Sequence, residues 1–537
     1  MISYTQKSFL VVDDFTEFRN SVKAMLRQIG AVNVDVGASG EEAIAMCRKK
    51  KYDIILHDYN LGPGKNGQQV LEELTLEKLL SPHTIFIMVT AENSLAMVMS
   101  AVEYEPDDYL TKPFNRAALL QRLDKLVERR EAMANVNDAA AREAWQDMVH
   151  ACDQLITTHR KYAAMAVRKK ALAFANMGNN KDLEILLRDV VSQRPVPWAL
   201  IMLGRLMLRK GDAGAVEILM QDAINQFPQL PALYDVLAEA QLMLEQKEAA
   251  QQTIQEALKT SPRSLSRQMK LGDLARTNGD LETAVKAFRE SVELGRGSCL
   301  KSPDNYIKFV SVVNEHASKE GTSLDRRYQE ETLKVLSELN KDYSEDKAVL
   351  ARSFLAQAVT LKNSGKEKEA QQWAKKATDS MAAMPHFFSA DAALDVIEQL
   401  KEVGQEDTAQ KLLHTCAEMY GDDPKILQSL TEQGGAAELM ARVAQARQLN
   451  KAAAALYEKR QFVEAIKSFQ VASDLQPRNI TIVLNAVQNL IQASKIQPEM
   501  TNEYKNQAAQ LLNNLKEMSP GDSRYERMQK LRRLISK

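Results

Sequence analysis

Residues 53–67 have the sequence DIILHDYNLGPGKNG. A short apolar run, Ile54-Ile55-Leu56, is followed by Asp58 and a glycine-rich loop, and helical spacing of apolar residues begins at Gly67. A short apolar run that ends at turn residues predicts a buried strand, and the periodic segment after the loop predicts a helix. This stretch therefore predicts one strand-loop-helix unit with an acidic residue at the carboxyl end of its strand.

The same alternation of short apolar runs and amphipathic segments fills the first part of the chain. Five units of this kind predict an α/β doubly wound, five-stranded parallel sheet whose functional groups lie at the carboxyl ends of the strands. The strands are expected at residues 9–12, 32–36, 53–56, 85–89 and 108–110, and the helices at 15–29, 40–50, 67–79, 94–103 and from 116 onward.

Polar residues follow four of these strands. Asp13 and Asp14 follow the first, Asp58 the third, Thr90 ends the fourth, and Lys112 follows the fifth. Three carboxylates at one sheet edge repel one another unless a hard cation lies between them, and Mg²⁺ suits such a site because it takes a few carboxylates and keeps waters. One carboxylate can then attack a phosphoryl group, while a hydroxyl and an ammonium stabilise the transferred charge.

Four blocks of sequence carry a family resemblance. They are FLVVDDFTEFR (9–19), DIILHDYNLGPGKNG (53–67), VTAE (89–92) and DDYLTKPF (107–114). In order and spacing they resemble the signature blocks of CheY-like response-regulator receiver domains. The resemblance covers roughly the first 125 residues, and the receiver domain is expected at residues 1–130. The alternative is a flavodoxin-like domain with incidental acidic residues, which would require five scattered positions to agree by coincidence.

The resemblance implies the chemistry of the carboxyl edge of the sheet that carries Asp13, Asp14 and Asp58, which we call the acidic edge. It makes Asp58 the phospho-acceptor, and it implies that Asp13, Asp14 and Asp58 hold Mg²⁺ together with the backbone carbonyl of Asn60. It also implies that Lys112 pairs with the phosphate.

The resemblance further implies how the state of the site is transmitted. Thr90 is expected to contact the phosphate, and Thr90 and Tyr109 to form the switch that remodels the face of the last two helices and the fifth strand. Asn60 and Glu92 occupy the positions that tune the lifetime of the phosphate. The peptide bond before Pro113 is expected to be cis.

Three features depart from the family pattern. The family usually has proline four residues after the acceptor and glycine eight after, whereas here Gly62 stands four after Asp58, Pro63 five after and Gly67 nine after, so the loop is expected to be one residue longer. Residues 104–106, Tyr-Glu-Pro, replace a common Ala-Gly-Ala. His57 lies beside Asp58, but neighbours on a strand point to opposite faces, so we expect His57 to be a packing or surface residue and not a general base.

The rest of the chain has helical spacing and an internal period of 34 residues. Gly204, Ala238 and Gly272 repeat at this interval, and Gly211 and Gly279 mark tight turns inside two of the units. The pattern resembles the tetratricopeptide repeat (TPR), in which small residues allow close helix crossing and a proline ends each unit. The clearest units are expected at about 197–230, 231–264, 265–298, 351–385, 391–424 and 446–479.

The remaining stretches fit the period less well. Residues 131–160 are expected to be a helical linker with a break at 135–138, ahead of a TPR-like region from 161 to 537 whose first unit, 161–194, is degenerate. Residues 302–345 depart from the period, which indicates longer helices, and residues 530–537 predict a final capping helix.

Composition narrows the class of protein. Among 537 residues, 70 Lys and Arg balance 71 Asp and Glu, so the chain has no overall attraction for nucleic acid or acidic membranes. No apolar stretch approaches the length of a membrane span, and Phe9–Val12 is too short for a signal peptide. The four cysteines are far apart, which favours reduced thiols. We therefore expect a cytoplasmic protein that neither inserts into a membrane nor binds DNA directly.

These patterns predict a signalling adaptor and not an enzyme, apart from phosphoryl transfer to itself and autodephosphorylation. A sensor histidine kinase would phosphorylate Asp58, and the repeat groove would bind a protein or peptide. Two alternatives stay open: a phosphate sink that competes for a shared kinase, and a constitutive scaffold. A homodimer is also possible, through the switch face or a repeat end.

Overall fold

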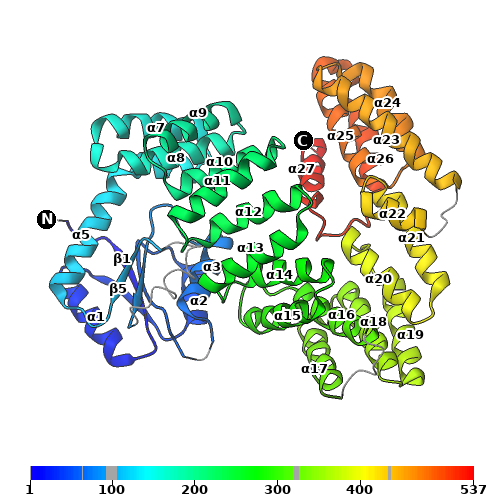
Figure 1. The fold of residues 1–537 in the computed structure, drawn as a ribbon. Helices are drawn as coiled ribbons and strands as arrows, with labels where there is room; N and C mark the ends of the chain where they lie inside the picture. The colour runs from blue at the N-terminus through cyan, green and yellow to red at the C-terminus, as the bar shows by residue number, and fades with distance from the viewer. Residues whose placement is uncertain (1, 63, 92–105, 320–325, 433–436, 537) are drawn as a thin grey trace. The chain divides into compact units, whose positions relative to one another are not determined.

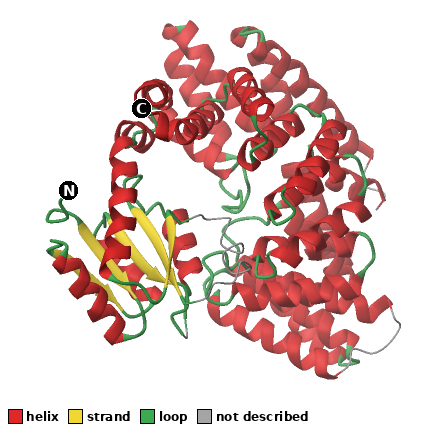
Figure 2. Ribbon diagram, turned by 60° about the vertical axis from the view of Figure 1, so that its left-hand side comes forward, coloured by secondary structure: helices red, strands yellow, loops and turns green. Residues whose placement is uncertain are grey.

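The computed structural model describes the chain except for residues 1, 63, 92–105, 320–325, 433–436 and 537. The chain divides into two compact units, Met1–Asn305 and Tyr306–Lys537. The first contains every strand described and a series of helices, and the second contains helices alone in its described part (Figures 1 and 2).

The sheet has the predicted architecture. Its strand order is β2-β1-β3-β4-β5, and every neighbouring pair is parallel. This order confirms the doubly wound fold, in which crossover helices cover both faces of a buried sheet. The strands are β1 (Ser8–Val12), β2 (Asn33–Gly37), β3 (Ile54–Asp58), β4 (Ile85–Thr90) and β5 (Asp108–Thr111).

Two hydrophobic cores lie on the two faces of the sheet. Phe9 and Val11 of β1 pack with α1 (Thr16–Gln28) and α5 (Arg116–Ala132). Leu10 and Val12, the alternate residues, pack with the helices of the other face, as the two-residue period of a strand requires. Those helices are α2 (Gly40–Lys49) and α3 (Gly67–Leu76), and the helix expected at 94–103 lies outside the described residues.

Helical hairpins follow α5 in the first unit. The predicted units 197–230, 231–264 and 265–298 each contain one hairpin, and the tight turns at Gly211 and Gly279 have φ of 85° and 78°, which glycine adopts readily. The helices are α6 (Ala134–Ala141), α7 (Trp145–Thr158), the 3₁₀ turn η1 (Arg160–Tyr162), α8 (Ala163–Asn176), α9 (Asn180–Gln193), α10 (Pro197–Arg209), α11 (Ala213–Gln226), α12 (Pro231–Met243), α13 (Lys247–Thr260), α14 (Leu265–Thr277) and α15 (Leu281–Gly295).

The small residues of the 34-residue period lie where helices approach closely. A Cβ atom placed on Gly272 of α14 would stand 2.5 Å from Cε1 of Phe288 on α15. A Cβ atom on Gly204 of α10 would stand 3.0 Å from Cγ1 of Val236 and 3.1 Å from Cε of Met220. The close helix crossing expected from the repeat pattern is therefore confirmed.

The helix break predicted at residues 135–138 is wrong. The helix α5 ends at Ala132, and α6 covers 134–141, so the breaks fall at Met133 and at 142–144. Asparagine and aspartate are weak helix formers, which suggested a break. However, Val136 and Asn137 are buried, and Val136 packs in the same core as Met148 of α7, so tertiary packing holds this segment helical.

The second unit contains further helical hairpins, with one hairpin at each of the predicted units 351–385, 391–424 and 446–479. The irregular stretch at 302–345 contains two helices of 17 residues, as expected from its departure from the period. The helices are α16 (Pro303–Lys319), α17 (Arg326–Asp342), α18 (Lys347–Asn363), α19 (Glu367–Ala382), α20 (Ala390–Glu402), α21 (Glu406–Tyr420), α22 (Pro424–Glu432), α23 (Ala437–Glu458), α24 (Phe462–Leu475), α25 (Ile480–Ile496), the 3₁₀ turn η2 (Pro498–Met500), α26 (Thr501–Asn513) and α27 (Tyr525–Ser536).

Within the described ranges, no helix combines the length and the apolar character that crossing a lipid bilayer requires.

Candidate functional site

The predicted site residues meet at the carboxyl edge of the sheet. Asp13 and Asp14 follow β1, Asp58 is the last residue of β3, Thr90 is the last of β4, and Lys112 follows β5. Parallel pairing aligns these strand ends, with Val12 opposite His57, Asp58 opposite Val89 and Thr90 opposite Thr111. Residues up to 99 positions apart in the sequence are thus brought to one place.

Three carboxylates form the centre of the site. Asp13, Asp14 and Asp58 each offer an oxygen, and these atoms lie within 4.8 Å of one another. Asp13 and Asp58 are buried, whereas Asp14 is exposed. Asp13 is held in place because its Oδ1 accepts a hydrogen bond of 2.9 Å from the backbone N–H of Phe15. Such a cluster suits a hard cation that keeps part of its water shell.

Lys112 supplies the positive charge of the site. Its Nζ lies 2.5 Å from Oδ2 of Asp13 and 3.0 Å from Oδ2 of Asp58. The ammonium also lies 4.2 Å from the ring centre of Phe18, a cation–π contact that helps to fix its position. The Lys112-Pro113 peptide bond is cis, as the resemblance implied.

The ionised form of the Asp58 carboxylate is electrostatically unfavourable when no cation is bound beside it. Burial raises the pKa of Asp58, the hydrogen bond and charge of Lys112 lower it, and the charge of Asp13 raises it again, with a net rise. A buried anion beside a second carboxylate is costly, and a bound cation relieves that cost. The donor set, all carboxylate oxygen with one exposed edge at Asp14, therefore fits Mg²⁺. Asn60, whose carbonyl is the expected fourth protein ligand, is exposed two residues after Asp58.

The expected switch residues occupy neighbouring strands. Thr90 is buried at the end of β4, and Tyr109 is half-buried on β5, where it packs against the core that covers α2 and α3. Tyr109 lies opposite Met88 in the register of β4 and β5, and Met88 is two residues before Thr90 on β4. Glu92 lies outside the described residues. The roles of Thr90, Tyr109, Asn60 and Glu92 stay predictions.

His57 is a packing residue, as expected. Its side chain is fully buried, and its ring stacks on Phe86 with centroids 5.8 Å apart. Nδ1 lies 2.7 Å from the carbonyl oxygen of Asp58, and because a carbonyl only accepts, Nδ1 carries the proton and donates. Burial lowers the pKa of His57 to about 4, so the ring is neutral.

The sequence interpretation missed one residue that shapes the site. Phe18 lies beneath the Lys112 ammonium and packs edge-on against Phe114, with ring centroids 5.7 Å apart. Both residues stand in the quoted blocks. The signal that could have found Phe18 is its place in the first turn of α1, four residues after Asp14.

A parallel five-stranded sheet with an acid triad and a lysine at its carboxyl edge defines a receiver domain. Comparison with known proteins agrees: residues 9–124 match the response regulator receiver domain family, and residues 266–294 match a tetratricopeptide repeat. The chain belongs to the response-regulator family, carrying a CheY-like receiver domain followed by TPR-type helices. It thus has the receiver of a two-component signalling protein and repeats of a type that binds other proteins.

The similar proteins match the receiver part of the chain. Chemotaxis protein CheY-3 of Vibrio cholerae is 34% identical over 120 residues, which are 22% of this chain and 91% of that protein. Chemotaxis protein CheY of Pseudomonas aeruginosa is 31% identical over 120 residues, 22% of this chain and 95% of that protein. Among solved structures, CheY4 of Vibrio cholerae shows 28% identity and a TM-score of 0.21, covering 22% of this chain and 98% of that one.

Proposed function

We propose that Asp58 accepts a phosphoryl group from a sensor histidine kinase or a small phosphodonor, and that the repeat region passes this state to a protein partner and not to DNA. The observation that supports this most directly is the convergence of three carboxylate oxygens within 4.8 Å, with the Lys112 ammonium 3.0 Å from Asp58. The balanced charge of the chain supports a protein partner over DNA.

The geometry supports a direct phosphoryl transfer. An Oδ oxygen of Asp58 attacks the phosphorus, the bond from phosphorus to the donor's nitrogen or oxygen breaks, and an acyl phosphate forms on Asp58. Mg²⁺ held by Asp13, Asp14 and Asp58 would neutralise part of the phosphoryl charge. Lys112 Nζ, which contacts both Asp13 and Asp58, would pair with the new phosphate, and Thr90, the last residue of the adjacent strand, would contact it through its hydroxyl. Water later attacks the phosphorus, the bond between the phosphorus and the Asp58 oxygen breaks, and inorganic phosphate leaves as the carboxylate is restored.

A shared hydrophobic core supports transmission from the receiver to the first repeat helices. Only Met133 separates α5 from α6, and Met133 and Val136 belong to the hydrophobic core that continues through α7 and α8. His83, which precedes β4, also lies 2.8 Å from Asp138 of α6, measured between Nε2 and Oδ1. A shift of α5 on phosphorylation would therefore displace the helices that share this core, α6, α7 and α8.

The acceptor is tested by labelling with acetyl phosphate and Mg²⁺ and then with a cognate kinase. We expect acid-labile labelling of the wild type, loss of labelling in Asp58→Ala, and retained labelling in Glu17→Gln, an exposed carboxylate of α1 that serves as the matched control. Labelling that survives in Asp58→Ala would contradict the assignment.

A second measurement separates transmission from a phosphate sink. Beryllofluoride mimics the phosphorylated acceptor without turnover. If the repeats transmit the signal, beryllofluoride will change which proteins the full chain captures, and Asp58→Ala will abolish that change. Identical capture with and without beryllofluoride would favour a sink or a constitutive scaffold.

A further inference from the structure

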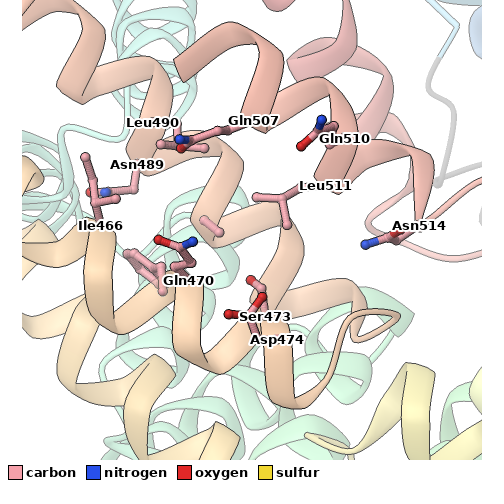
Figure 3. A pocket seen from close by; sticks show the side chains of 12 residues that line it. Ile466, Gln470, Ser473, Asp474, Asn489, Leu490, Gln507, Gln510, Leu511 and Asn514 are labelled. Carbon is pink, nitrogen blue, oxygen red and sulfur yellow. The ribbon is translucent and has the colours of Figure 1, made fainter. Parts of the chain in front are cut away.

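A cavity of about 260 Å³ lies between α24, α25 and α26 in the second unit. Figure 3 shows its side chains converging from the three helices: Ile466 and Gln470 from α24, Leu490 from α25, and Leu511 from α26. The helix α24 is the second helix of the 446–479 repeat, and α25 and α26 are the next two helices along the chain.

Two buried polar atoms lining the cavity have no hydrogen-bond partner. Asn489 is fully buried, and its Nδ2 donates a hydrogen bond of 2.9 Å to the carbonyl oxygen of Phe462. Because a carbonyl only accepts, this bond fixes the amide orientation, and Oδ1 is left as an acceptor without a donor. Ser473, 2% exposed, also has a hydroxyl without a partner. Buried polar groups are normally satisfied, so these atoms point to a bound group that supplies hydrogen bonds.

The surroundings of these two atoms define the chemistry of that group. The apolar side chains Ile466, Phe469, Leu490 and Leu511 offer packing for an aliphatic or aromatic group. Among the lining residues, Asp474 alone carries a formal charge, and it is exposed. The amides that complete the lining, which can both donate and accept, are Gln470, Gln507, Gln510 and Asn514.

This lining disfavours several classes of ligand. The negative charge of Asp474 opposes phosphate-bearing molecules, and a single carboxylate is too few for a divalent cation. The volume of about 260 Å³ also falls below the roughly 300–1,000 Å³ of pockets that enclose whole small molecules. A side chain of a protein partner, with the backbone beside it, suits a cavity of this size and polarity.

We propose that this cavity binds an extended segment of a partner protein that presents an apolar side chain next to a Lys or Arg. The apolar side chain packs against Phe469 and Leu490, a backbone N–H donates to Oδ1 of Asn489, and the cation lies near Asp474. The segment is extended because a helical segment already uses its backbone N–H groups internally. This inference deepens the proposed function, since it assigns a partner-binding site to the repeat region.

The test uses the full-length protein and fluorescent peptides of defined design. One set has a central Leu, Met or Phe flanked by Lys or Arg, a second set replaces these flanks with Glu, and a third carries an N-methyl group on the central residue, which removes the backbone donor. Fluorescence anisotropy gives each affinity. We expect the Lys and Arg set to bind, and the Glu and N-methyl sets to bind about tenfold more weakly or worse.

Variants connect the binding to the cavity. Ser473→Ala is expected to weaken the best peptide about three- to tenfold without lowering thermal stability, because the hydroxyl has no partner in the free protein. Asp474→Lys is expected to weaken it about tenfold. Glu464→Lys, an equal charge reversal at an exposed position of α24 that does not line the cavity, is expected to leave the affinity unchanged.

Each outcome decides the proposal. If no peptide set binds with a Kd below about 1 mM, the inference is overturned. It is also overturned if Glu464→Lys weakens binding as much as Asp474→Lys, because the peptide then responds to the charge of the surface and not to the cavity. Acetyl phosphate labelling of Asp58 is measured on the same samples. Failure of peptide binding with intact labelling would refute this site alone, whereas loss of labelling would refute the proposed receiver chemistry.

Discussion

At the scale of single residues, the ionised carboxylate of Asp58 lowers the stability of the fold, and a bound cation would offset this destabilisation. Burial raises the pKa of Asp58, so the folded state holds the ionised carboxylate less readily than the unfolded chain does. Because the pKa of Asp58 is higher in the folded protein, the folded protein becomes more stable as the pH falls through this pKa and Asp58 takes up a proton. At higher pH, where Asp58 is ionised, that stability is lost. Without Mg²⁺ at neutral pH, Asp58→Asn should therefore stabilise the fold by on the order of 1 kcal/mol.

Mg²⁺ should reverse this order, because a cation bound by carboxylates stabilises only the protein that retains its ligands. Urea unfolding of the full chain, followed by hydrogen exchange of the β-sheet amides, measures both conditions. In EDTA the Asn variant should be more stable, and in excess Mg²⁺ the wild type should gain more. An Asn variant that is the less stable protein in EDTA would contradict the electrostatic account.

His57 predicts a second pH dependence of opposite sign. Burial lowers its pKa to about 4 from an ordinary 6.5. At a pH between these two values, His57 is protonated in the unfolded chain but neutral in the folded protein. Stability attributable to His57 is therefore complete above about pH 6.5 and falls as the pH approaches 4, by on the order of 3 kcal/mol. His57→Phe, which keeps the stack on Phe86, should remove this slope.

Denaturation midpoints of the full chain between pH 7 and pH 4 provide the measurement. His150→Gln is the matched control, because His150 is exposed on α7. The control should keep the slope of the wild type. If His57→Phe keeps it as well, His57 is not the group responsible.

The sequence alone located the residues of the acidic edge, because each directly follows an apolar strand and the parallel fold brings strand ends together. It could not locate Phe18, whose contact with Lys112 depends on how α1 leaves β1. It also could not find Asn489 and Ser473, because their significance depends on a cavity completed by α26, a helix outside the repeat units identified.

At the scale of elements, the close crossing of α14 and α15 at Gly272 predicts that a larger residue there lowers the stability of the protein. Gly272→Ala would bring a Cβ atom 2.5 Å from the ring of Phe288, which is fully buried and has little room to move. Overpacking of this kind costs about 1–3 kcal/mol. Gly214→Ala is the matched control, because Gly214 lies in the helix α11 with no atom within 4 Å of its Cβ position.

The control should stabilise the protein by about 0.5–1 kcal/mol, since alanine favours helix over glycine. Thermal unfolding of the two variants in the same buffer provides the comparison. Two substitutions of equal chemistry are thus expected to have effects of opposite sign. Equal effects would mean that the α14–α15 crossing is looser than the structure shows.

Element boundaries could be predicted from the sequence where periodicity and turn residues agree, as at β1 and at the hairpins closed by Gly211 and Gly279. The prediction failed at residues 135–138, where propensity and packing disagree. Two asparagines and an aspartate suggested a break, but the burial of Val136 stabilises the helix. Such burial depends on the partner helix α7 and is not visible in the local sequence.

At the scale of the whole molecule, the helices between receiver and repeats have a packing role that a linker would not have. Met148 and Cys152 of α7 are fully buried in a core that also contains Ala166 of α8 and Leu183 of α9. The assignment of residues 131–160 as a helical linker remains a prediction. The packing of α7 indicates that it covers the first repeat hairpin.

Fragments of the first unit distinguish a linker from a packed cap. A fragment of residues 131–305 should fold cooperatively, whereas residues 161–305 should lose about 5 kcal/mol or more, because each large apolar side chain of α7 contributes about 1.5–3 kcal/mol when buried. Within the full chain, Met148→Ala should weaken hydrogen-exchange protection of α8 by about 2–5 kcal/mol, and the exposed neighbour Asp147→Ala should not. Equal urea midpoints for the two fragments would show instead that α7 only connects. If α7 proves to be a cap, movement of α5 reaches the first repeat helices, α8 and α9, through one continuous hydrophobic core within the first unit.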